Sequence, residues 1–206
     1  TINDFGDETD LSDIDSADLF LTAVVSTGVD IRSNPTAVGG NPEFGIASVV
    51  DRFNLVGAGD LTLTASQADG QSVIGSGVVT VTDLADATNL AGIDSTDLSV
   101  TATVTGETDI SENDGVGSVD YFVVSGNLTL SSAQADERHI SGSGDVTVKD
   151  LADNTDLSNV STLLTVTATV TDSIDISSNP TDQSGDGIEV IVDTFDIQEG
   201  GLTLSL

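Results

Sequence analysis

The sequence predicts an all-β protein, a parallel β-solenoid (β-helix) built from repeats of about 67 residues. Three observations support this prediction. The chain repeats itself, short apolar–polar–apolar triplets recur at even spacing, and Gly, Asn, Asp and Ser fill the segments between them. Turns stacked on one another would give such a chain a narrow, continuous core. The alternative is a row of tandem Ig-like β-sandwiches, but such a domain usually needs about 100 residues and seven strands.

The internal repeat is long and free of gaps. Residues 60–94 align onto residues 127–161 with a constant shift of 67 positions, so that Gln67 and Asp69 correspond to Gln134 and Asp136. We therefore divide one continuous array, 1–206, into a divergent unit (1–78), a second unit (79–145) and a truncated third unit (146–206). Because the chain opens on Thr rather than Met, we expect a segment of a longer protein.

The strands are predicted from triplets that alternate apolar and polar residues. Triplets that begin at Leu61, Val79 and Leu98 are 18 and 19 residues apart, and the next copy repeats them from residues 128, 146 and 164. A period of two is the pattern of a strand with one buried face. Only short stretches such as residues 66–69 fit a helical turn.

Composition excludes several classes of partner and site. The 206 residues include 35 acidic and 4 basic side chains, a formal net charge of −31. A nucleic-acid partner would need Lys and Arg to bind phosphates, so we expect none. The absence of Cys excludes disulfides and thiolate metal sites. No apolar run approaches the roughly 20 residues of a membrane span. The hydrophobic 37% is concentrated in β-branched stretches, which favours a folded chain over a disordered one.

The acidic residues recur at fixed offsets. An acid–x–x–acid–x–Thr–acid/amide–Leu motif follows a strand in all three units, and a second acidic cluster follows the long strand in two of them. Calcium takes six to eight oxygen ligands at about 2.3–2.6 Å, and like charges on neighbouring turns would repel without a cation. For any single Asp, a role in turn formation and solubility is the alternative. The predicted Ca²⁺ ligands, in several sites, are Asp4, Asp7, Asp10, Asp83, Asp86, Asn89, Asp109, Glu112, Asp114, Asp150, Asp153, Asp156, Asp175, Asp182 and Asp186.

The sequence gives little support to catalysis, and we expect no enzyme. His139 is the single histidine, its counterpart one repeat earlier is Ser72, and we place it in an exposed turn. Paired carboxylates can hydrolyse glycosides, but a sugar groove needs aromatic or basic groups, and the chain has one Tyr, six Phe and four cations. We expect these cations to pair with local carboxylates: Arg32, Arg52, Arg138 and Lys149.

Three recurring motifs carry a resemblance to known proteins. They are Leu-Thr-Leu-[Thr/Ser]-x-x-Gln-Ala-Asp, Ile-Ser-Gly-Ser-Gly-Asp-Val-Thr-Val at residues 140–148, and Asp-Leu-Ala-Asp-x-Thr-[Asp/Asn]-Leu. Together they resemble the β-strand repeats of large bacterial cell-surface and secreted proteins, including calcium-dependent repeat adhesins exported by type I secretion and S-layer-type proteins. The resemblance implies an extracellular or cell-surface location and folding completed by Ca²⁺. The chain departs from it by lacking the glycine-rich nonapeptide G-G-x-G-x-D.

These observations predict a structural repeat segment of an extracellular surface protein. It would serve as a stalk, a surface-layer subunit or a filament subunit, stiffened by Ca²⁺ and partnered by neighbouring repeats or copies of itself. The alternative is an adhesive binding module that presents recognition loops at residues 32–44, 107–117 and 177–187, with a cell-surface glycan as a candidate partner. A polysaccharide-active β-helix enzyme is the weaker alternative.

Overall fold

The computed structural model describes residues 1–7, 9, 11, 14, 19–33, 45–177 and 188–204. The all-β prediction is confirmed: parallel strands stack turn upon turn as a β-solenoid. Every strand pair in the described residues is parallel, which excludes the Ig-like alternative because those sandwiches are antiparallel. The chain forms two compact units, the first from residues 1–84, 88–102 and 114–119, and the second from residues 85–87, 103–113 and 120–206.

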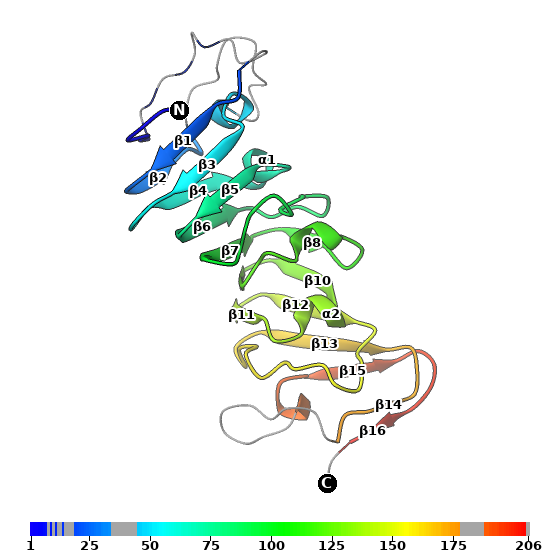
Figure 1. Cartoon of the computed structure of the whole chain (residues 1–206). Coiled ribbons are helices and arrows are strands. Elements are labelled where there is room, and N and C mark those ends of the chain that lie inside the picture. The colour runs from blue at the N-terminus through cyan, green and yellow to red at the C-terminus, as the bar shows by residue number, and fades with distance from the viewer. Residues whose placement is uncertain are drawn as a thin grey trace. The chain divides into compact units, whose positions relative to one another are not determined.

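The first unit has two parallel sheets (Figure 1). One sheet takes its strands in the order β1-β3-β5, and in the other the order is β2-β4-β6-β7. The bounds are β1 Thr22–Val25, β2 Gly28–Asp30, β3 Arg52–Leu55, β4 Asp60–Thr64, β5 Ser72–Gly75, β6 Gly77–Thr82 and β7 Leu98–Val104. Short helical turns lie between strands: η1 Gly45–Ser48, α1 Ala65–Ala68 and η2 Asp114–Val116.

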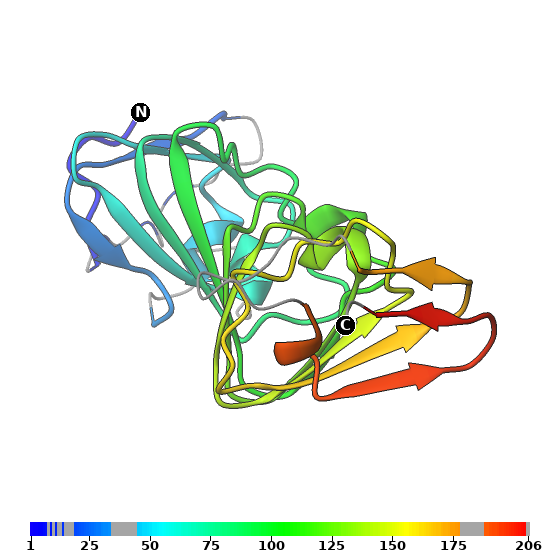
Figure 2. The same cartoon turned by 90° about the horizontal axis from the view of Figure 1, so that it is seen from below.

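The second unit repeats this plan. Its main sheet has the order β8-β10-β12-β13-β15, while β9 pairs with β11 and β14 with β16. Its turns, coloured green to orange, lie over one another in Figure 2. The bounds are β8 Glu107–Asp109, β9 Tyr121–Val124, β10 Asn127–Ser131, α2 Ser132–Ala135, β11 His139–Gly142, β12 Asp145–Lys149, β13 Thr165–Val170, β14 Ile174–Asp175, η3 Ile188–Val190, β15 Thr194–Ile197 and β16 Leu202–Thr203.

Apolar side chains of successive turns stack in register and form the core of each unit. In the first unit Leu61, Val79 and Val100 are register partners and are fully buried. In the second unit the equivalent stack is Leu128, Val146 and Val166. These three are at most 1% exposed. The aliphatic stacks explain how a chain with few aromatic residues obtains a core.

The register differs from the predicted spacing in one respect. Val79 pairs with Val100, whereas the triplet pattern aligned it with Leu98. The same two-residue shift occurs in the second unit, where Val146 pairs with Val166 instead of Leu164. The buried face alternates with a period of two, so a shift of two residues leaves the pattern unchanged and the sequence does not distinguish the two registers.

The predicted helical turn at residues 66–69 is confirmed as α1, and α2 is its counterpart. Both begin with a capping box, in which Thr64 and Gln67, or Ser131 and Gln134, satisfy each other's backbone N–H groups. None of the described helices has the length and apolar character needed to span a bilayer.

Candidate functional site

The acidic motif folds into the turn that follows a strand. Its first acid adopts a left-handed backbone in all three copies, with φ of 54° at Asp4, 57° at Asp83 and 53° at Asp150. Asp tolerates this region better than most residues because its short side chain bonds locally to the backbone. The first acid of the motif is therefore a turn former.

The second acid of the motif joins one turn to the next. In each copy its carboxylate accepts a hydrogen bond from a backbone N–H that lies 22 or 23 residues later in the sequence. The donors are the N–H groups of Asp30, Asp109 and Asp175, which donate to Asp7 (2.7 Å), Asp86 (2.7 Å) and Asp153 (2.8 Å). A bond to a charged acceptor is stronger than one between neutral groups.

The side chains of the residues that donate this N–H accept hydrogen bonds themselves. The carboxylates of Asp109 and Asp175 accept the backbone N–H two residues later, at 3.0 Å in both cases. A second series follows the same rule: Asp136 accepts the N–H of Asp156, and Asp156 accepts that of Ser158. The acids thus satisfy backbone donors that the turns leave unpaired.

The remaining motif positions close the turn. The Thr155 hydroxyl accepts the N–H of Ala152 at 3.2 Å and is almost fully buried. The terminal Leu of the motif is buried in every copy: Leu11, Leu90 and Leu157. The recurring positions of the motif therefore each have a structural role in the turn.

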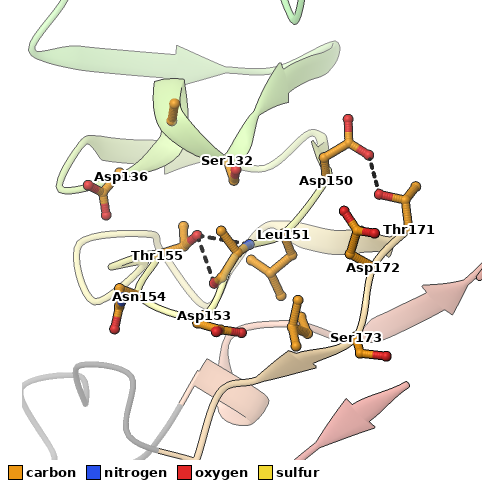
Figure 3. Close-up of a pocket in the computed structure, with 13 residues that line it drawn as sticks. Ser132, Asp136, Asp150, Leu151, Asp153, Asn154, Thr155, Thr171, Asp172 and Ser173 are labelled. Atoms are coloured by element: carbon orange, nitrogen blue, oxygen red, sulfur yellow. Dashed lines mark hydrogen bonds between the residues drawn. The ribbon is translucent and has the colours of Figure 1, made fainter. Parts of the chain in front are cut away.

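In the second unit this turn borders an open hollow of about 550 Å³, shown in Figure 3. Four carboxylates line it: Asp136, Asp150, Asp153 and Asp172. Asp150 accepts a hydrogen bond from the Thr171 hydroxyl at 2.8 Å, drawn as a dashed line. In Figure 3 Asp150 and Asp172 are drawn beside Thr171, whereas Asp136 and Asp153 lie apart from them.

Local partners lower the pKa of several of these acids. Hydrogen bonds from Lys149 and then Ser111 lower the pKa of Asp109 to about 2. Lys149 Nζ lies 2.8 Å from the Asp109 carboxylate and 2.9 Å from the Ser111 hydroxyl. The pKa of Asp175 is lowered by the Ser177 hydroxyl and backbone N–H, and that of Asp30 mainly by Arg32. These groups stay ionised well into the acid range.

The predicted calcium ligands lie in several different turns of the described chain. In the described part of the chain, no group of three or more Asp, Glu or His side chains is arranged to hold a metal ion. One oxygen of each of Asp7, Asp86 and Asp153 accepts a backbone N–H group. Among the other predicted ligands, Asn89 accepts the N–H of Ala91, Glu112 lies in a turn, and Asp114 begins η2. Asp10, Asp182 and Asp186 lie outside the described residues.

The predicted pairing of cations with local carboxylates is confirmed for three of the four. Arg32 pairs with Asp30 at 2.7 Å, Lys149 with Asp109 at 2.8 Å and Arg138 with Asp120 at 3.9 Å. Arg52 differs, because its guanidinium lies over the Phe20 ring, 5.2 Å from the centroid.

Two features were missed by the sequence reasoning. The amide of Gln134 donates to the carbonyls of Ile110 and Asn113, and Gln67 donates likewise to Ile31. The Thr/Ser-x-x-Gln spacing of a capping box would have indicated these glutamines. The second feature is a stacked pair of Tyr121 and His139. His139 opens β11, so placing it in a turn was wrong.

No protein-family model matches the chain, and neither curated proteins nor solved structures give a match.

Proposed function

We propose that this chain is a structural repeat segment that extends or stiffens an extracellular surface protein. The observation that supports the proposal best is the repeated bond from a motif carboxylate to the backbone N–H of a later turn. Residues that recur for catalysis or binding would converge on a substrate, whereas these recur where one turn meets the next. The acidic composition then serves two ends: it joins turns, and it keeps the outer surface charged and soluble.

The proposed role has a direct test in amide hydrogen exchange. Asp153→Ala removes the acceptor of the Asp175 N–H, so we expect that amide to exchange at least about tenfold faster. Asp172→Ala is the matched control, since Asp172 lines the same hollow and loses the same charge. Asp153→Asn keeps an acceptor oxygen and should restore slow exchange. Equal exchange in Asp153→Ala and Asp172→Ala would contradict the joining role.

The spacer role has a second test at the level of the particle. Small-angle X-ray scattering of one, two and three copies joined in tandem should give a maximum dimension that rises in proportion to copy number, as stacked repeats require. A dimension that grows only as that of a compact globule would contradict the role. Antibody labelling of intact source cells tests the surface location separately, and signal only after lysis would refute it.

Calcium stiffening stays a prediction drawn from the sequence, since the described residues include no cluster of three or more acidic or histidine side chains. If calcium bridges acidic turns, excess EDTA at low salt should lower the melting temperature, and added Ca²⁺ should restore it. Mg²⁺ at the same ionic strength is the control for simple screening. A melting temperature that EDTA leaves unchanged would remove calcium from the proposal without affecting the spacer role.

A further inference from the structure

A neutral hollow lies beside the stacked ring pair of the second unit. Its volume is about 320 Å³, near the lower end of the range for small-molecule pockets. None of the lining residues carries a formal charge at pH 7 with His neutral, in a chain whose net charge is −31. The lining residues are Tyr121, His139, Ile140, Ser141, Ser158, Asn159, Val160 and Ser161. A wall without carboxylates offers no counter-charge to a polyamine and favours an uncharged ligand.

The two rings project from adjacent paired strands. Tyr121 and His139 are register partners on β9 and β11, with ring centroids 4.9 Å apart and planes within 15° of parallel. The buried neighbours Phe122 and Ile140 fix both strands in the core. Tyr121 is nevertheless 42% exposed, and His139 is exposed as well. Half-exposed rings with polar edges are suited to binding because a side chain with only two χ angles loses little entropy.

Polar groups around the rings are unused. In the described part of the chain, the Tyr121 hydroxyl and the side chains of Ser141, Ser158 and Asn159 make no hydrogen bond. They offer hydroxyls and an amide, which both donate and accept. The charged pair next to the hollow, Arg138 and Asp120, is already joined at 3.9 Å.

From this arrangement we propose that the hollow binds a neutral sugar ring of a glycan. An apolar C–H face of the sugar would lie against the rings, and its hydroxyls would bond to Ser141, Ser158 and Asn159. The site lies on β9, β11 and residues 158–161, and the proposal is independent of the spacer role. It uses a surface where the second unit departs from the first, because the equivalent register pair there is Arg52 and Ser72.

The chain supplies its own reporters for a test. Tyr121 is the single tyrosine, there is no tryptophan, and His139 is the single histidine, so tyrosine fluorescence and the imidazole C–H signals in NMR each report one residue. The full chain would be titrated into the millimolar range with the neutral hexaoses of cellulose, amylose and mannan. We expect saturable changes of both reporters with at least one of these sugars.

Variants test whether the two rings themselves contribute to sugar binding or only report a sugar bound nearby. The double variant Tyr121→Arg, His139→Ser copies the first unit's pair, and we expect it to fold and to bind about tenfold more weakly or worse by calorimetry. Ser72→Ala is the matched control in the first unit and should bind as the wild type does. Should the double variant fail to fold, Asn159→Ala, which keeps both rings, should still weaken binding severalfold. Unchanged reporters with all three hexaoses, or unchanged affinity in folded variants, would overturn the proposal.

Discussion

In the first unit β3 and β5 place Arg52 opposite Ser72, whereas in the second unit β9 and β11 place Tyr121 opposite His139. The next residue of the strand is a buried phenylalanine in both units: Phe53 follows Arg52, and Phe122 follows Tyr121. The motif carboxylates bond to the same backbone positions in both units. The copies therefore agree where side chains fill the core or satisfy the backbone, and differ where side chains face solvent. Positions constrained by folding are thereby separated from positions available for function.

The largest effect is expected at a glycine corner that both copies share. Gly75 and Gly142 have positive φ (106° and 128°), and a Cβ at either would meet the carbonyl of Leu55 or Val124 on the preceding turn. We expect Gly142→Ala, like Gly75→Ala, to lower the free energy of unfolding by about 3 kcal/mol in chemical denaturation. Gly106→Ala is the control, since nothing lies within 4 Å of its Cβ position. A small effect in one copy alone would show that the two corners are not equivalent.

The capping-box glutamines, Gln67 and Gln134, come next. Gln134→Ala removes half of the capping box and two bonds to carbonyls, so we expect a loss of about 2 kcal/mol. Gln134→Glu keeps the acceptor for the Ser131 N–H but cannot donate to Ile110 and Asn113 in its ionised form. It should therefore be destabilised at neutral pH as well. Full stability of the Glu variant would mean that only the capping box matters.

Asp86 and Asp153, the second acids of two copies of the motif, should contribute equally to stability. Asp86→Ala and Asp153→Ala each remove one bond to a backbone N–H at an exposed turn, and we expect each to cost about 1 kcal/mol. Thermal melting of the two variants beside Asp172→Ala measures the difference. If only one of the pair is destabilised, the repeat is not energetically regular.

The smallest effect concerns Lys149, for which the equivalent position in β6 is Thr82. The pair with Asp109 is well exposed, so Lys149→Met should cost only about 0.5 kcal/mol near neutral pH. Because the folded pKa of Asp109 is about 2, below its ordinary 3.8, this stabilisation is present above pH 3.8 and is lost as the pH falls through 2. The difference in stability between Lys149→Met and the wild type should therefore disappear as the pH falls from 3.8 to 2. Lys149→Arg, which keeps the charge, should be as stable as the wild type throughout. A difference independent of pH would point to lost packing.

Much of the fold could be predicted from sequence because its rules are local. The alternation in Leu61-Thr62-Leu63 marks one buried face, and the even recurrence of such triplets sets the length of a turn. The register of Val100 could not be predicted, since a two-residue shift buries the same face.

The partners in the candidate sites depend on which turn lies over which. Asp153 and Asp175 meet because their turns are stacked, and Tyr121 meets His139 for the same reason. Spacing alone showed that the acids recur, and that recurrence suggested a metal as readily as a backbone donor. Only the stacked geometry shows that one oxygen of each of several carboxylates accepts a backbone N–H group.

The short connections between paired strands also bear on how the chain acquires its fold. Between β10 and its partner β12 the chain forms only α2 and β11, and between β4 and its partner β6 it forms only α1 and β5. Parallel strands in other folds often wait for distant partners, and such long-range pairing slows folding. Here each new turn finds its partner on the turn made just before it. A ribosome releasing this chain would therefore complete the protein progressively, with little unpaired sequence exposed at any moment.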